Sequence, residues 1–172
     1  MTTRGTDKFI EPHLGAGEET DMSLRGVISG FSRWSAVGGA IAVSAALVVP
    51  QALGFGLLAG LVIVVVTITL AFLLILSVVG KPLAARHDPV LGTPYVTIAL
   101  TSHRLLLIER GLGKELSKLV EETPRSQVSL VSYTKGGVLK PQRLTYRAGK
   151  RERSFEFPRM ERASLFAETL ED

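Results

Sequence analysis

The longest hydrophobic tract in the chain runs from Trp34 to Gly80 and contains no Asp, Glu, Lys, Arg or His. A membrane-spanning helix needs about 20 consecutive apolar residues, so one helix over the whole tract would be too long for a single crossing. Proline and glycine residues in the segment PQALGFG, residues 50–56, interrupt the helical pattern. The tract therefore predicts a two-helix transmembrane hairpin over residues 34–80, with spans at about 34–52 and 57–79.

Basic residues flank this tract on both sides, and the predicted turn between the spans carries no charge. Arg25 and Arg33 precede the tract, and Lys81, Arg86 and His87 follow it. Because segments rich in Lys and Arg stay in the cytoplasm, the pattern predicts a two-pass protein with both termini cytoplasmic. Two alternatives stay open: removal of the first segment as a signal peptide cleaved near residues 44–46, and a re-entrant loop.

Small residues gather in the first predicted span and at the start of the second. Such residues let helix backbones approach closely in lipid, where helices associate without a hydrophobic drive. The candidate helix-packing positions are Gly38, Ala42, Ala46, Gly56 and Gly60. They fit packing within the hairpin or, alternatively, contact with a second copy or another membrane protein. The tract lacks the ionisable residues that pumps and proton relays place inside the membrane, which argues against transport.

The N-terminal arm shows two patterns. Residues 1–22 mix Thr, Gly, Glu and Asp without periodicity and are predicted to be disordered. Leu24, Val27, Ile28 and Phe31 then recur at helical spacing. Residues 23–33 are therefore predicted to form an amphipathic helix that lies in the membrane interface or, alternatively, extends the first span.

After a connector at residues 81–92, the pattern changes to the alternation of β-strands. Residues 95–100 (YVTIAL) and 105–110 (LLLIER) predict two strands, and residues 143–147 (RLTYR) and 153–157 (RSFEF) predict a hairpin. Residues 161–170 repeat apolar positions at helical spacing. The predicted fold class is therefore membrane α + β: a two-helix transmembrane hairpin followed by a small antiparallel sheet that a C-terminal helix caps.

The segment IALTSHRLLLIERG resembles the recurrent segment of bacterial pleckstrin-homology-like domains, in which a strand ends in a Thr-x-x-Arg turn, here Thr101 and Arg104. The segments PRSQVSLVSY, RLTYR, RSFEF and ERASLFAETL follow in the family's order. The resemblance covers residues 93–171, and it implies that residues 93–172 form a cytoplasmic domain with a bent, seven-stranded sheet of split-barrel type. It also implies a place beside helices of the bacterial cytoplasmic (inner) membrane, binding of lipid headgroups or protein segments, and no catalytic residues.

Composition excludes several kinds of chemistry. The chain has no Cys, which removes thiolate nucleophiles and disulfides. His13, His87 and His103 share no metal-binding spacing, and no phosphate-binding loop or nucleophile motif is present in the sequence. We therefore predict no catalytic residues, no metal, no cofactor and no enzymatic activity.

The net charge of +4 comes from the C-terminal part, since residues 1–33 hold four basic and five acidic side chains and the apolar tract holds none. The best binding candidate is a group of six cations around the predicted hairpin: Lys140, Arg143, Arg147, Lys150, Arg151 and Arg153. Arg143 and Arg147 share a strand face, so the group would offer a cationic surface to lipid phosphates. Alternatively, these charges keep an exposed sheet edge soluble. The absence of aromatic residues among them argues against nucleic acid.

Together these patterns predict a non-enzymatic, membrane-anchored binding or scaffold protein whose cytoplasmic domain recognises a partner protein or anionic lipid. The alternative is an accessory or assembly subunit of a larger membrane complex, with the helical hairpin as the interaction element. The predicted partners are membrane lipid and either another membrane protein or a second copy of the chain.

Overall fold

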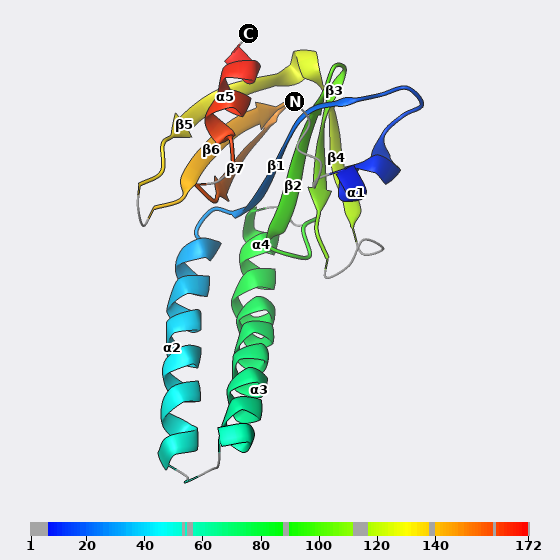
Figure 1. The fold of residues 1–172 in the computed structure, drawn as a ribbon. Coiled ribbons are helices and arrows are strands. Elements are labelled where there is room, and N and C mark those ends of the chain that lie inside the picture. Colours follow the sequence, from blue (N-terminus) through cyan, green and yellow to red (C-terminus); the bar gives the residue numbers. More distant parts are fainter. Residues whose placement is uncertain are drawn as a thin grey trace.

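The strands and helices in Figure 1 belong to a computed structural model that describes residues 7–52, 54, 57–87, 90–111, 117–137, 140–159 and 161–171. Seven antiparallel strands form one sheet in the order β4-β3-β2-β1-β7-β6-β5. Two long helices, α2 and α3, lie side by side and leave the sheet at one end (Figure 1). We call this the helix end of the sheet and the opposite end the far end.

The elements follow one another along the chain as strand, helices, strands and a last helix. The strands are β1 (Thr20–Ile28), β2 (Tyr95–Thr101), β3 (Arg104–Glu109), β4 (Lys118–Pro124), β5 (Val128–Thr134), β6 (Gln142–Ala148) and β7 (Arg151–Phe157). The α-helices are α1 (Asp7–Ile10), α2 (Phe31–Ala52), α3 (Leu57–Ile75), α4 (Lys81–His87) and α5 (Ala163–Glu171). A π-helical turn, Leu76–Gly80, joins α3 to α4, and 3-10 turns occupy Glu11–His13 and Arg125–Gln127.

The sheet begins before the long helices, because β1 precedes α2. β1 lies in the middle of the sheet, where it pairs with β2 along most of its length and with β7 at its end. The prediction of an amphipathic helix over residues 23–33 is therefore wrong for residues 23–28. Leu24 and Ile28 fit both periods, and burial of the alternating positions Leu24, Gly26 and Ile28 against the core selects the strand.

The predicted fold class also needs correction in its membrane part. Within the described residues, one helical stretch, Val62–Arg86, is long and apolar enough to cross a membrane. None of the most apolar part of this stretch is buried inside the protein. The small residues of α2, together with Arg33, make that helix less apolar than α3. The prediction of a two-helix transmembrane hairpin followed by a sheet is therefore wrong in the number of candidate spans and in the order of the elements.

The C-terminal part follows its sequence pattern more closely. β2, β3, β6, β7 and α5 confirm the strands and the helix predicted at their positions. The residues predicted as a connector, 81–92, begin with the helix α4. The core lies on the inner face of the sheet, where Ile98 and Leu107 pack with Tyr146 and Phe157 and with Phe166 of α5. Each such side chain contributes roughly 1.5–3 kcal/mol by leaving water.

The N-terminal arm covers part of the outer face of the sheet. Ile10 is fully buried against Ala99, Leu106 and Ile108 of β2 and β3. The prediction of disorder is therefore wrong for residues 7–22, while residues 1–6 lie outside the described part of the chain. A single buried isoleucine creates no periodic pattern, so the sequence contains no indication that the arm is ordered.

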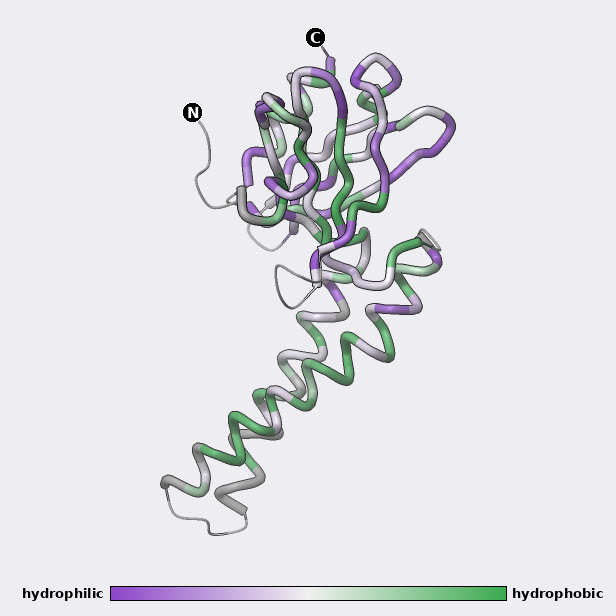
Figure 2. Tube along the Cα trace, turned by 90° about the vertical axis from the view of Figure 1, so that its right-hand side faces the viewer, coloured by the Kyte–Doolittle hydropathy of each residue, from purple (hydrophilic) through white to green (hydrophobic). Residues whose placement is uncertain are grey.

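Hydrophobic side chains end up in different places in the two parts of the molecule. In the sheet domain they fill the core, whereas Val62, Val65, Leu70 and Leu74 of α3 are exposed. Figure 2 shows hydrophobic residues along both long helices and hydrophilic residues concentrated in the sheet domain. An exposed apolar surface of this kind marks contact with a membrane or with another protein.

Candidate functional site

The six predicted cations of the β6–β7 region do not form one cluster. β6 starts at the helix end and finishes at the far end, so Lys140 and Arg143 lie near the helices while Arg147 lies at the opposite end. Arg143 and Arg147 are four positions apart along the strand, a distance of about 13 Å. Lys150 and Arg151 lie at the turn between β6 and β7, where Gly149 donates a hydrogen bond to the Gln127 carbonyl at 2.9 Å. The hairpin therefore divides the predicted site.

Arg153 is inside the domain. Its side chain is only 5% exposed, and its guanidinium forms an ion pair with Glu121 of β4. Phe155 and Phe157 alternate with Arg153 along β7, so all three share the inner face of the sheet. The ion pair thus links β7 with the edge strand β4 and is not a surface for a ligand.

Arg147 has an acidic partner at the far end. Its guanidinium lies 3.6 Å from Glu152, and both side chains are more than half exposed. An exposed pair of this kind contributes between zero and about 1 kcal/mol. The far end therefore carries solvated, partly neutralised charge.

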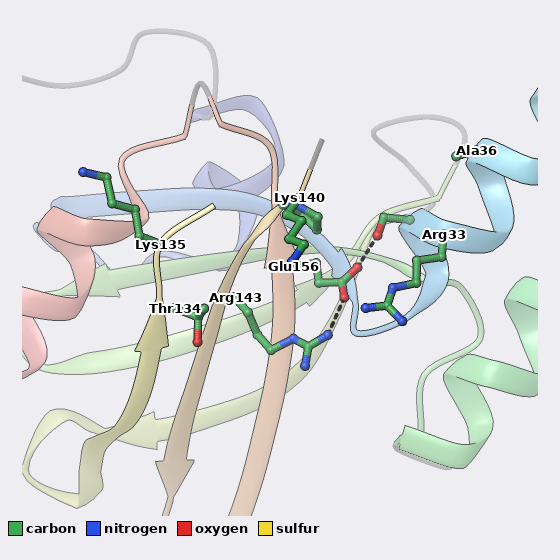
Figure 3. A pocket seen from close by; sticks show the side chains of 9 residues that line it. Arg33, Ala36, Thr134, Lys135, Lys140, Arg143 and Glu156 are labelled. Atoms are coloured by element: carbon green, nitrogen blue, oxygen red, sulfur yellow. Dashed lines mark hydrogen bonds and ion pairs between the residues drawn. The ribbon is translucent and has the colours of Figure 1, made fainter. Parts of the chain in front are cut away.

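The helix end contains a cavity of about 380 Å³ between α2 and the ends of β5 and β6. Its lining residues are Ser32, Arg33, Ala36, Thr134, Lys135, Lys140, Pro141, Arg143 and Glu156. Figure 3 shows Arg33 of α2 and Arg143 of β6 approaching Glu156 from opposite sides, while the Lys135 side chain extends away from them. Four cations and one carboxylate therefore border this cationic pocket.

Glu156 fastens α2 to the sheet. Its carboxylate accepts hydrogen bonds from the Gly30 backbone N–H at 3.1 Å, from the Ser29 and Ser32 hydroxyls, and from the Arg143 guanidinium at 2.9 Å. The side chain is 2% exposed. Burial alone would raise the pKa of Glu156, but the hydrogen bonds from Ser32, Arg143 and Gly30 outweigh burial and lower this pKa. Glu156 thus stays ionised, and its charge is already engaged by α2 and Arg143.

The other cations of the pocket have no such compensation. Among the described residues, Arg33, Lys135 and Lys140 form no ion pair, and all three are exposed. Arg143 gives one nitrogen to Glu156 and remains 45% exposed. A guanidinium presents five N–H donors in a planar fork that matches carboxylate and phosphate oxygens. The pocket can therefore receive an anionic group with several acceptor oxygens.

A second cavity of about 360 Å³ adjoins the first, and the two share Ser32, Pro141 and Glu156. Its other walls combine Arg25 and Arg110 with apolar and aromatic side chains: Val27, Phe31, Tyr95 and Phe157. Burial lowers the pKa of the Arg110 guanidinium, and the nearby charge of Arg25 lowers it further. Burial also raises the pKa of Tyr95. This second cavity is thus a less polar neighbour of the cationic pocket.

The Thr-x-x-Arg turn lies at the far end and serves the N-terminal arm. The backbone N–H of Arg104 donates to the Thr101 hydroxyl at 3.1 Å, which closes the turn. The Arg104 guanidinium forms ion pairs with Glu18 of the arm and Glu122 of β4. The Arg104 guanidinium is the main cause that lowers the pKa of Glu18 to about 2. Arg104 therefore has a structural role, because it links the N-terminal arm to β4.

The predicted helix-packing positions have separate outcomes. A side chain at Gly38 would collide with Ile75 of α3, and Ala42 is buried. Gly60 is partly buried in α3. Ala46 lies in α2, but its side chain is outside the described part, as is Gly56 altogether. Gly38 thus allows α2 and α3 of the same chain to pack closely.

Sequence reasoning missed Arg33, Lys135 and Glu156 as members of one site. Arg33 precedes β6 by more than a hundred residues, and only the insertion of α2 after β1 brings it there. Glu156 had a usable signal, because it alternates with Phe155 and Phe157 and must face away from the core. In the part of the chain that the structure describes, no group of three or more His, Asp or Glu residues is arranged to hold a metal ion.

Comparison with known proteins adds no identification. No protein-family model, no curated protein and no solved structure matches the chain. The resemblance to pleckstrin-homology-like domains therefore stays a prediction, and function is inferred from the geometry of the cationic pocket.

Proposed function

We propose that the protein is a membrane-anchored binding protein, rather than an enzyme, that recognises the phosphate of an anionic lipid headgroup. The cationic pocket at the helix end is the proposed binding site. The observation that carries this proposal is the presence of Arg33, Lys135 and Lys140, exposed and without an ion pair among the described residues, around one cavity where the apolar helices leave the sheet.

The position of the pocket supports a ligand at the membrane surface. A bilayer around the apolar stretch Val62–Arg86 has its headgroup layer at the basic end of that stretch, which contains Lys81 and Arg86. Figure 1 places α4, the start of α2, the end of β5 and the start of β6 at the same end of the sheet. The pocket therefore lies at the height of the headgroups.

The charge of the pocket favours phosphate. Each Lys or Arg close to an anionic membrane surface contributes about 1 kcal/mol of attraction. Arg143 keeps donors free beside the nitrogen that Glu156 uses, and Arg33 faces it across the carboxylate (Figure 3). Two arginine forks and a lysine can donate to the two non-bridging oxygens of a phospholipid phosphate.

We also propose that the domain faces the cytoplasm of a bacterial cell. Basic residues flank the apolar stretch on the side of the sheet domain, as the positive-inside rule requires for a cytoplasmic face. β1 and β2 are hydrogen-bonded to each other, so the chain segments before α2 and after α4 belong to one sheet, and that sheet domain as a whole is the part that we propose faces the cytoplasm.

The test compares two variants that lose the same charge. The near variant is Arg33→Gln, Lys135→Gln, Lys140→Gln, and the far variant is Arg147→Gln, Lys150→Gln, Arg151→Gln. Native mass spectrometry of the full chain counts phosphatidylglycerol and phosphatidylcholine bound from an equimolar mixture. We expect the near variant to lose about ten- to hundredfold of its preference for phosphatidylglycerol, from three cations at about 1 kcal/mol each.

The far variant is the matched control and should keep the preference of the unchanged chain. An equal loss in both variants would mean that total charge, not the pocket, attracts the lipid. A chain that shows no preference for phosphatidylglycerol would contradict the proposed function directly.

A further inference from the structure

A third cavity lies between the two long helices. It has a volume of about 110 Å³ and is lined by Phe31, Ser35, Gly39, Ala42, Val43, Ile68, Phe72 and Ile75. Ser35 is the one polar residue of this lining, and its hydroxyl donates to the Ser32 carbonyl at 2.9 Å within α2. The remaining surface is apolar, so this cavity suits a hydrocarbon group.

This apolar cavity lies next to the second cavity, which in turn adjoins the cationic pocket. The second and third cavities share Phe31 and Ser35, and the first and second share Ser32, Pro141 and Glu156. The lining thus changes from cationic to mixed to apolar along the first turns of α2. From Arg33 to Val43 the helix rises by about 15 Å, which is half of the roughly 30 Å hydrocarbon core of a bilayer.

We propose that one amphiphile occupies this path, with its phosphate in the cationic pocket and one acyl chain between α2 and α3. The inference rests on the proposed function and names the class of ligand, an anionic phospholipid bound with an ordered chain. The occupant follows from charge at one end of this row of cavities and apolar walls at the other.

Two neighbouring glycines show that the distance between the packed surfaces of α2 and α3 varies along the helices. A Cβ atom at Gly38 would collide with the side chain of Ile75, so this glycine lets α2 approach α3. A Cβ atom at Gly39 would have no heavy atom within 4 Å, although Gly39 lines the third cavity. The helices therefore pack closely at Gly38 and leave room beside Gly39.

The test uses the full chain in phosphatidylcholine nanodiscs that contain a small fraction of phosphatidylglycerol with a photoreactive group in its acyl chain. Illumination followed by peptide mass spectrometry maps the labelled residues. We expect labelling to concentrate on the α2 and α3 residues that line the third cavity. Photoreactive phosphatidylcholine with the same acyl chain should label those residues several-fold less, and the near variant should lose the difference.

The variants Gly39→Ala and Gly39→Leu fill the cavity in two steps, and Ala40→Leu places the same leucine side chain on the exposed side of α2. Labelling by photoreactive phosphatidylglycerol should fall progressively for the two Gly39 variants and stay unchanged for Ala40→Leu. Because Gly39→Ala adds one methyl group to open space, it reports on the cavity even where Gly39→Leu unfolds.

A second arm separates a lipid from a free phosphate compound. Phosphatidylglycerol should compete for the pocket at least about tenfold better than glycerol 3-phosphate, since burial of two methylenes alone corresponds to about that factor. Equal competition by phosphatidylglycerol and glycerol 3-phosphate would overturn the acyl-chain site. Labelling spread uniformly around α2 and α3 by both photoreactive lipids would overturn it as well. If the preference for phosphatidylglycerol over phosphatidylcholine survives in that outcome, the proposed function stands without the acyl-chain site. Loss of this preference would contradict the proposed function and the acyl-chain site together.

Discussion

The two ends of the sheet carry similar cations in different electrostatic settings. At the far end, Arg104 pairs with Glu18 and Glu122, Arg125 pairs with Asp21 at 3.1 Å, and Arg147 pairs with Glu152. At the helix end, the described residues offer Arg33, Lys135 and Lys140 no acidic partner. Within the described residues, the far end thus pairs Arg104, Arg125 and Arg147 and leaves the exposed Lys150 without an ion pair, whereas the helix end leaves three cations without a partner around one cavity.

This difference shows that the candidate site is identified by cations that lack an acidic partner, and not by a high density of basic residues in the sequence. The run from Arg147 to Arg153 is the most basic stretch of the sequence around the hairpin, yet its members point to the far end and to the interior. The carboxylate at the helix end, Glu156, is engaged by α2 as well as by Arg143. Its negative charge therefore serves the attachment of the helix more than the neutralisation of the pocket.

The largest effect should come from the cation that belongs to neither end. Arg153→Met leaves Glu121 without the partner that holds it against β7, and breaking a buried pair costs about 3–5 kcal/mol. We expect that loss in the free energy of unfolding of the detergent-solubilised chain, measured by denaturant titration. Arg153→Met with Glu121→Gln should recover most of it, and a single variant as stable as the unchanged chain would refute the structural role of Arg153.

Acid should weaken the far end through Glu18. The pKa of Glu18 is lowered from 4.5 to about 2, so its contribution to stability is complete above about pH 4.5 and is lost as the pH falls towards 2. A shift of this size corresponds to about 3 kcal/mol. Unfolding free energies measured between pH 6 and pH 2 should fall more steeply for the unchanged chain than for Glu18→Gln. Parallel pH profiles would show that the ion pair with Arg104 contributes little.

A smaller effect should distinguish the carboxylates opposite Arg143 and Arg147. Glu156→Gln removes the charge that α2 and Arg143 share, and hydrogen bonds to a charged group contribute roughly 1.5–3 kcal/mol. Glu152→Gln at the exposed pair should change the free energy of unfolding by less than about 0.5 kcal/mol. Denaturant titration of the two variants side by side checks this, and equal losses would contradict the different burial of the two carboxylates.

The smallest effect should be that of salt on stability at the far end. Because the Arg147–Glu152 pair is exposed, raising the salt concentration should screen it almost completely. The unchanged chain and Arg147→Gln should then have free energies of unfolding that converge to within experimental error at about 1 M salt. A persistent difference would mean that Arg147 stabilises the fold by packing instead of by charge.

Local patterns in the sequence predict much of the sheet, and long-range placement accounts for what they miss. Alternation over residues 95–100, 143–147 and 153–157 indicates strands that the structure contains, because strand periodicity depends only on near neighbours. β1 escapes such reasoning, since Leu24, Val27 and Ile28 suit a helix equally well. Only pairing with β2, across the inserted helices, decides its structure.

The candidate site could be predicted only in part for the same reason. Lys140 and Arg143 stand out in the sequence because they are close to other basic residues, but strand direction decides which end each residue reaches. Arg33 looks like an ordinary flanking charge of an apolar tract until α2 is placed beside β6. No rule of spacing along one strand brings residues from two distant segments together.

The insertion of the helices behind the first strand has a consequence for biosynthesis. The middle strand of the sheet leaves the ribosome first, and its neighbours on both sides are made only after residues 29–94. β1 must therefore wait, unpaired, while α2 and α3 are synthesised. The sheet is completed only when the chain after α4 pairs with β1, so a copy in which this pairing fails is left with an open, unfinished domain for proteases to remove.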